Sequence, residues 1–213
     1  MAMRRLWGWL WLAFALALGT VPAQAHPHVW ITASSELIYA PDGSVTAVRH
    51  AWTFDDMYST YALQGLDSKT KGVFSREELA PLAQTNVESL KEFRFFTFAK
   101  ADGKKLKFQE PVDYYLEYKD SLLTLYFTLP LQTPVQSKAL AVEVFDPEFF
   151  IDFTFAEKDP VKLVGAPTGC QFKFQRPSDG SASAQKLGEQ NFLDDGNSTF
   201  GAMFANKITV DCP

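Results

Sequence analysis

The chain has 213 residues and carries 25 acidic against 20 basic side chains, which gives a net charge of −5. A chain with this charge is a poor partner for nucleic acid or for an anionic membrane surface. Hydrophobic residues make up 46% of the chain and aromatic residues 15%, which is ample material for the core of one domain.

The first 25 residues have the pattern of a secretory signal peptide. Arg4 and Arg5 precede an apolar run at 6–18, and residues 21–25 end in a small-x-small cleavage site. The apolar run is too short for a membrane span, and no second long apolar run follows. We therefore expect residues 1–25 to be removed. Residues 26–213 are then expected to form one β-rich periplasmic domain with no direct membrane insertion.

Cleavage after Ala25 would leave His26 as the first residue, with His28 two positions further on. A free α-amine and imidazole nitrogens are ligands for divalent zinc, nickel, cobalt or copper. Pro27 has no amide hydrogen, so a square-planar site that uses backbone nitrogens is not available. Chelation by the amine and imidazole of His26 remains, joined by His28 or by groups from elsewhere. The alternative is a frayed terminus that binds nothing.

A β-hairpin is predicted next, with strands at 29–39 and 45–54 around a turn at 41–44. Placing Ala40 opposite Val45 brings the apolar residues of both strands onto one face, whereas a slip of one residue would mix them with polar ones. The residues that share the core face in the favoured register are Ile31, Ala33, Leu37, Val48, Trp52 and Phe54.

The same register places a histidine in the core and two aspartates near the N-terminus. His50 falls opposite Ser35, where a hydrogen-bonded core imidazole is favoured over a metal ligand. Asp55 and Asp56 fall near His28. A carboxylate there could complete a metal site or orient an imidazole, and the competing interpretation is a helix N-cap. Adjacent aspartates allow both roles.

Two helices are predicted after the hairpin, one from Asp55 or Asp56 to Leu66 and one at 76–93 capped by Ser75. The stretch between them, 67–78, has the outline of an EF-hand loop with Asp first, Gly sixth and Glu twelfth. Lysines 69 and 71 stand at the positions where oxygen ligands belong, and their charge would repel Ca²⁺. We expect no calcium there.

Short strands follow the helices, separated by turns such as Asp102-Gly103. A long loop is expected at 176–201. The predicted fold class is α+β, a mainly antiparallel β-sandwich with a helix-loop-helix insertion, similar to a degenerate EF-hand, at about 55–93. The predicted strands are 94–99, 104–108, 112–118, 122–129, 139–145, 150–155, 161–164, 171–175 and 207–210.

The only two cysteines are Cys170 and Cys212, which in an oxidising compartment predict one disulfide. A thiolate metal site is the weaker alternative, because such sites usually contain closely spaced cysteines. Carboxylates at 146–152 lie beside aromatic residues. Asp146 there is either an oxygen ligand or acid–base group, or the start of an Asp-Pro turn.

The chain resembles a family of bacterial periplasmic proteins that are described as periplasmic components of an ABC-type transport system and are encoded beside nickel/cobalt-type permeases. The resemblance covers nearly all of the mature chain. It implies a role in divalent transition-metal traffic, with His26, His28, Asp55 and Asp146 at matching positions. The segments that carry it are His26-Pro27-His28-Val29-Trp30, Trp52-Thr53-Phe54-Asp55-Asp56-Met57-Tyr58-Ser59, the 67–78 loop, Phe145-Asp146-Pro147-Glu148-Phe149-Phe150 and Cys170.

These observations favour a binding protein over an enzyme. The leading hypothesis is a periplasmic metal-binding accessory protein of a transport system that serves an inner-membrane metal permease. Its ligands would be His26 and His28, with Asp55, Asp56 or Asp146 nearby. One alternative is an interaction module that docks on the permease without holding metal, and another is a copper-dependent oxidase built on the N-terminal histidine.

Overall fold

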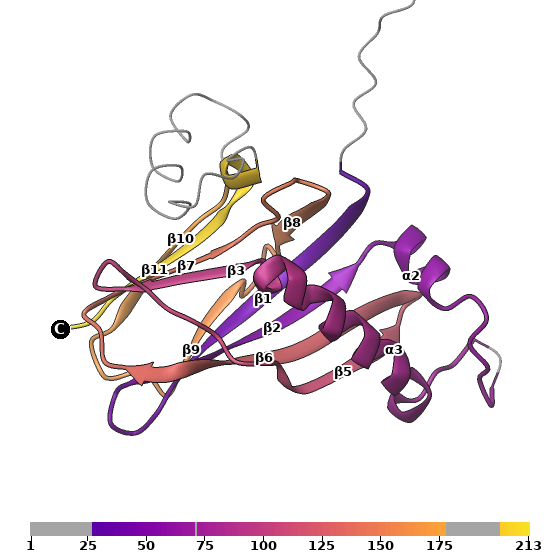
Figure 1. Cartoon of the computed structure of the whole chain (residues 1–213), viewed down its shortest axis with the longest axis horizontal. Helices are drawn as coiled ribbons and strands as arrows, with labels where there is room; N and C mark the ends of the chain where they lie inside the picture. The colour runs from indigo at the N-terminus through magenta and orange to yellow at the C-terminus, as the bar shows by residue number, and fades with distance from the viewer. Residues whose placement is uncertain (1–26, 71, 178–200) are drawn as a thin grey trace, which may run out of the picture.

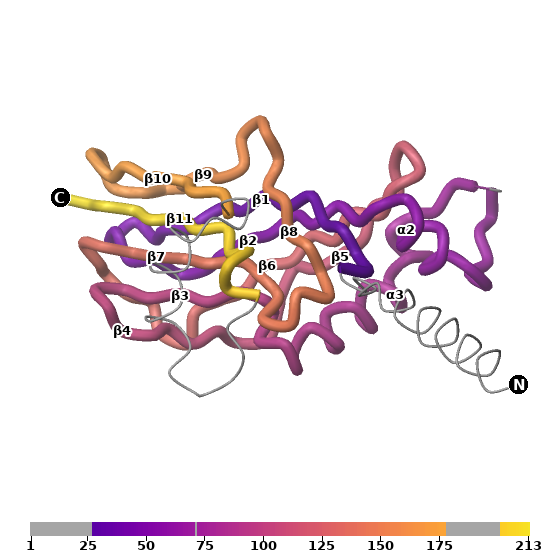
Figure 2. The backbone as a smooth tube through the Cα atoms, turned by 90° about the horizontal axis from the view of Figure 1, so that it is seen from above, coloured from indigo at the N-terminus to yellow at the C-terminus, as the bar shows by residue number. Residues whose placement is uncertain are grey.

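The structure is a computed structural model that describes residues 27–70, 72–177 and 201–213. Two β-sheets pack against each other as a sandwich, and the two α-helices of these residues lie at one end of the molecule (Figures 1 and 2). The fold is therefore α+β and mainly antiparallel, as predicted. None of the helices in the described residues is long and apolar enough to cross a membrane.

The first sheet has the strand order β5-β6-β2-β1-β8, and β9 also pairs with β1. The predicted hairpin register is confirmed, because Ala33 lies opposite Trp52 and Leu37 lies opposite Val48. A bulge after Ile38 places Tyr39, in place of Ala40, opposite Val45. The strands of this sheet are β1 (Val29–Tyr39), β2 (Val45–Phe54), β5 (Val112–Lys119), β6 (Leu122–Val135), β8 (Ile151–Phe155) and β9 (Val161–Val164).

The second sheet has the order β10-β11-β7-β3-β4 and is antiparallel throughout. Its inner face contributes a row of apolar side chains around Val142 and Ile208, both fully buried. The predicted disulfide is present and joins Cys170, before β10, to Cys212, after β11. The strands are β3 (Thr97–Ala101), β4 (Lys104–Lys105), β7 (Ala139–Val144), β10 (Gln171–Gln175) and β11 (Asn206–Asp211).

The helices continue the core beyond the second sheet. The long strands of the first sheet extend past the shorter strands of the second, and α3 covers the free part, where it packs on β5 (Figure 1). Leu79, Ala83 and Val87 of α3 are buried in the same cluster as the sheet residues. The helical elements are α2 (Asp56–Ala62), α3 (Arg76–Leu90), and the 3-10 helices η1 (Lys91–Phe96) and η2 (Gly201–Phe204).

Several boundaries differ from the prediction. The first helix ends at Ala62, well before Leu66, and the second ends at Leu90, before the 3-10 segment. Strand β3 begins at Thr97 because residues 94–96 adopt left-handed backbone angles that no strand allows. The expected loop at 176–201 lies outside the described residues except at its two ends.

Candidate functional site

His28 lies at the start of the first strand, beside the turn that precedes β8. Its backbone N–H donates to the carbonyl oxygen of Phe150 at 2.8 Å, and the rings of the two residues are in contact, tilted by 35° with centroids 4.7 Å apart. This contact follows from the parallel pairing of β1 with β8, which begins with Val29 opposite Ile151. His28 is exposed to solvent. His26 lies outside the described residues.

Asp55 is the N-cap of α2. One carboxylate oxygen accepts the N–H of Tyr58 at 2.8 Å, and the other accepts the N–H of Trp30 at 2.9 Å. The Asp55 backbone N–H in turn donates to the Trp30 carbonyl at 2.9 Å. The carboxylate therefore fixes the start of the helix to the start of β1, which agrees with the N-cap interpretation. Asp56 lies in the first turn of the helix and is exposed.

Asp146 organises the turn on which His28 rests. Its side chain is buried, and its two oxygens accept three backbone N–H groups, each at 2.9 Å, from Glu148, Phe150 and Ile151. Hydrogen bonds to a carboxylate are stronger than those between neutral groups. Gly201 packs against the same turn, and a Cβ on it would lie 1.8 Å from the Asp146 carbonyl oxygen. The turn that presents Phe150 is thus held from both sides.

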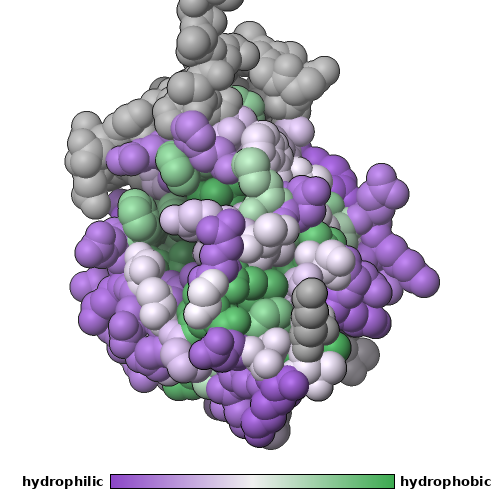
Figure 3. Space-filling view, turned by 90° about the vertical axis from the view of Figure 1, so that its right-hand side faces the viewer, coloured by the Kyte–Doolittle hydropathy of each residue, from purple (hydrophilic) through white to green (hydrophobic). Residues whose placement is uncertain are grey.

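A cavity of about 370 Å³ opens between this turn, the β1–β2 hairpin and the two α-helices. Its volume falls in the range of small-molecule sites. Most of its wall is apolar, and Phe93 and Phe150 are half-exposed at its edge. The face at the helical end of the molecule also carries apolar side chains at its centre, inside a border of hydrophilic ones (Figure 3). The cavity is therefore suited to accept an apolar group at this end.

Polar groups line one side of the cavity. The Tyr58 hydroxyl donates to Asn86 Oδ1 at 3.2 Å, and burial, with a smaller contribution from Asp55, raises the pKa of Tyr58. The side-chain nitrogens of Asn86 and Trp52 are buried and have no hydrogen-bond partner among the described residues. Glu148 is an exposed carboxylate that also lines the cavity.

Sequence reasoning selected Asp146 from the 146–152 stretch and passed over Glu148. The Asp-Pro pair is the sequence signal that could have favoured Glu148 over Asp146 as the available carboxylate. The aspartate that begins such a turn accepts the N–H groups that follow, so its oxygens are occupied, and the next carboxylate remains available.

His50 lies in the core, as predicted, and does not join the N-terminal site. Its Nδ1 is 2.8 Å from Ser35 Oγ, and its Nε2 is 3.1 Å from Thr97 Oγ1. Thr97 gives its single hydroxyl hydrogen to the Phe95 carbonyl, so it accepts from Nε2–H, and Ser35 donates to Nδ1. Complete burial lowers the pKa of His50 to about 3. The ring is therefore neutral at physiological pH.

The loop with the EF-hand outline uses its last carboxylate for its own backbone. Glu78 accepts the N–H of Lys69 and the N–H of Ser75, each at 2.8 Å, and forms a capping box with Ser75 at the start of α3. These two bonds hold both carboxylate oxygens of the twelfth loop position.

Of the predicted site residues, the structure describes four and brings them to one end of β1: His28, Asp55, Asp56 and Asp146. His28 contacts the Asp146 turn through Phe150, and Asp55 contacts the same strand through Trp30. In the described ranges no group of three or more His, Cys, Asp or Glu side chains is placed to hold a metal ion.

One protein-family model matches residues 11–212, nearly the whole chain. The chain belongs to that family, which is described as protein of unknown function (DUF1007). It is also similar to an uncharacterized protein of Haemophilus influenzae, with 25% identity over 193 residues that cover 88% of this chain and 91% of the relative. The matched range of DUF1007 includes the N-terminal histidines, Asp55, the Asp146 turn and both cysteines.

Proposed function

We propose that the mature protein is a periplasmic accessory protein that binds a divalent transition metal at the start of its chain and serves an inner-membrane metal permease. The observation that supports the proposal is the contact of His28 with Phe150, which lies two residues after the exposed carboxylate of Glu148 in the same turn. The amine and imidazole of His26, the imidazole of His28 and one carboxylate are a donor set for zinc, nickel, cobalt or copper. The disulfide is of the kind found in oxidising compartments such as the periplasm.

The contacts divide four of the carboxylates at this end into two roles. Asp55 and Asp146 accept backbone N–H groups with both oxygens, so we assign them to positioning the strand start and the turn. Asp56 and Glu148 are exposed and accept no hydrogen bond from another described residue. The ligand set proposed is therefore His26 and His28 with Glu148 or Asp56.

A titration of the mature protein with Zn²⁺, Ni²⁺ and Cu²⁺ tests this set. Adding one residue before His26 blocks the chelate formed by the amine and its own imidazole, and His28→Gln removes the second imidazole. Each change is expected to weaken binding by about tenfold or more, and Glu148→Gln by several-fold. Asp211→Asn, at the exposed end of β11, is the matched control and is expected to leave the affinity unchanged. Equal affinities for the extended and unextended proteins would exclude the amine as a ligand.

The apolar cavity supports a second candidate function, docking of a permease segment without metal. Half-exposed Phe93 and Phe150 at its edge are suited to accept an apolar side chain of a partner. Native mass spectrometry of protein taken from the periplasm distinguishes the two functions, because it reports the first residue and any bound ion together. A metal-free protein whose melting temperature does not respond to any of the three metals would favour docking.

A further inference from the structure

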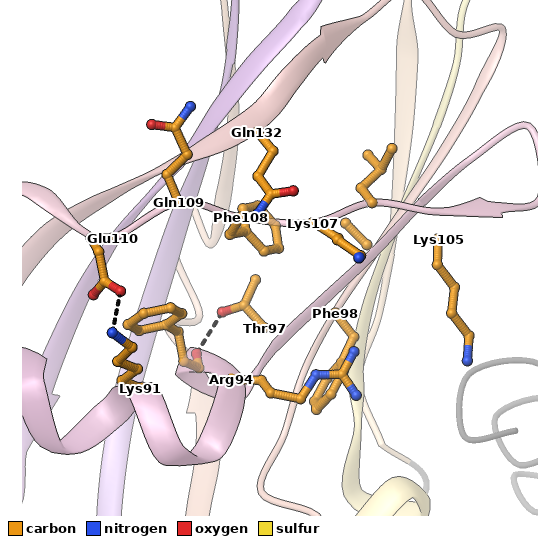
Figure 4. Close-up of a pocket in the computed structure, with 13 residues that line it drawn as sticks. Lys91, Arg94, Thr97, Phe98, Lys105, Lys107, Phe108, Gln109, Glu110 and Gln132 are labelled. Atoms are coloured by element: carbon orange, nitrogen blue, oxygen red, sulfur yellow. Dashed lines mark hydrogen bonds and ion pairs between the residues drawn. The ribbon is translucent and has the colours of Figure 1, made fainter. Parts of the chain in front are cut away.

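A second cavity, of about 340 Å³, lies near the edge of the second sheet, between η1, β3 and the segment 105–110 (Figure 4). Its wall includes the aromatic rings of Phe95, Phe98 and Phe108. This cavity shares none of its lining with the N-terminal site. It therefore offers a separate place for a ligand with an apolar body.

The charge around this cavity is opposite to that of the protein. The whole chain is acidic, yet four basic residues and one acidic residue line the cavity. Lys91 pairs with the acidic one, Glu110, at 2.6 Å. Arg94, Lys105 and Lys107 form no ion pair with any other described residue. Like charges gathered against a low-dielectric wall repel one another and create a positive potential that an anion neutralises.

The backbone fixes Arg94 at this place. Arg94, Phe95 and Phe96 are consecutive non-glycine residues with φ of 55°, 55° and 48°, and the left-handed region is strained for side chains of this size. Burial of the two phenylalanines offsets this strain, and Thr97 Oγ1 donates to the Phe95 carbonyl at 2.8 Å. Thr97 is joined in turn to His50 in the core. Hydrogen bonds through Thr97 thus connect the turn to the core.

The guanidinium of Arg94 is also fixed at its far end. Its central carbon lies 4.9 Å from the centroid of the Phe98 ring, within the range of a cation–π contact. Figure 4 shows Arg94 and Lys107 reaching toward the same space from opposite sides, with Lys105 further along. A guanidinium that is already held loses little entropy when it binds a planar anionic group with two hydrogen bonds.

We propose that this cavity binds a small organic anion. Its apolar or aromatic body rests on the phenylalanine wall, and its carboxylate, sulfonate or phosphate is bound by Arg94 and Lys107. The binding requires both parts of the ligand, since the ring wall supplies the contact area and the two cations select the charge. It is independent of the metal-binding function proposed for the N-terminus.

The test uses the mature, disulfide-bonded protein and two probes of matched shape, naphthalene-2-sulfonate and neutral naphthalene-2-methanol, in isothermal titration calorimetry. The sulfonate is expected to bind more tightly than the alcohol and to weaken as salt is added. Arg94→Gln is expected to weaken sulfonate binding by about tenfold and Lys107→Gln by several-fold. Arg94→Lys keeps the charge without the planar fork and is expected to lie between the wild type and Arg94→Gln.

Lys104→Gln is the matched control. Lys104 lies in β4 beside Lys105 but does not line the cavity. It removes the same charge and is expected to change the affinity less than twofold. Equal binding of the two probes, no saturable binding, or an equal loss in Lys104→Gln and Arg94→Gln would each overturn the proposal. Urea midpoints of all variants identify any that fail to fold. Lys107→Gln leaves the left-handed turn intact and provides the answer if Arg94→Gln does not fold.

Discussion

The buried imidazole of His50 makes the stability of the protein depend on pH in a defined direction. The pKa of His50 is about 3 in the folded protein against an ordinary value of 6.5. Between these values the unfolded chain binds one more proton than the folded one, so acid favours unfolding. The contribution of the neutral His50 ring to the free energy of unfolding is fully present above pH 6.5 and is lost as the pH falls toward 3. At pH 4 the loss amounts to about 3 kcal/mol.

Urea unfolding followed by circular dichroism, at pH 7 and at pH 4, measures this loss. His50→Gln has no titratable ring, so its unfolding free energy should fall between the two pH values by about 3 kcal/mol less than that of the wild type. Its lower stability at pH 7 does not affect this comparison. Glu143, whose pKa is raised by burial, acts in the opposite direction, but it is present in both proteins and cancels. An equal pH response of the two proteins would refute the reasoning.

Three further predictions concern stability, each measured by urea unfolding. Asp55→Ala should lose about 1 to 2 kcal/mol with the N-cap, whereas Asp56→Ala should stay within about 0.5 kcal/mol, and equal effects would contradict the assignment of the cap. Asp146→Asn keeps the shape but replaces one accepting oxygen with an NH2 donor, so at least one of the three hydrogen bonds is lost and the others lose the charge of the acceptor. A loss of about 2 to 3 kcal/mol is expected, and an unchanged midpoint would argue against this role. Cys212→Ser should cost about 4 kcal/mol, as should reduction of the Cys170 disulfide in the wild type, and no further loss should follow when the variant is reduced.

Most of the elements could be predicted from the sequence because they depend on interactions between residues close together in the chain. The hairpin register followed from the alternation of apolar residues, since a slip would have placed Arg49 among the core residues. The Asp55 and Ser75 caps followed from the side chains that such positions require. The disulfide followed from there being only two cysteines in a chain that begins with the pattern of a secretory signal peptide.

The features that sequence reasoning missed depend on contacts between distant segments. The parallel pairing of β1 with β8 joins Val29 to Ile151, and no short-range pattern encodes it. The left-handed angles at 94–96 contradict the strand expected there, because burial of Phe95 and Phe96 outweighs their local preference. Both cavities are lined by segments that are far apart in the sequence. Only the structure therefore shows that Glu148 lines one cavity and Lys107 the other.

The place of β1 in its sheet has a consequence for how the chain acquires its structure. This strand is the earliest of the described ones in the chain, yet its neighbours on one side, β8 and β9, come more than a hundred residues later. The backbone groups on this edge of β1 therefore stay unpaired until β8 and β9 have been synthesised. Pairing between strands so far apart in the sequence is slow. A product truncated before residue 151 would retain that open edge, which is a template for aggregation. Synthesis of the chain as far as β9 is in this sense a condition for closing this edge of the first sheet.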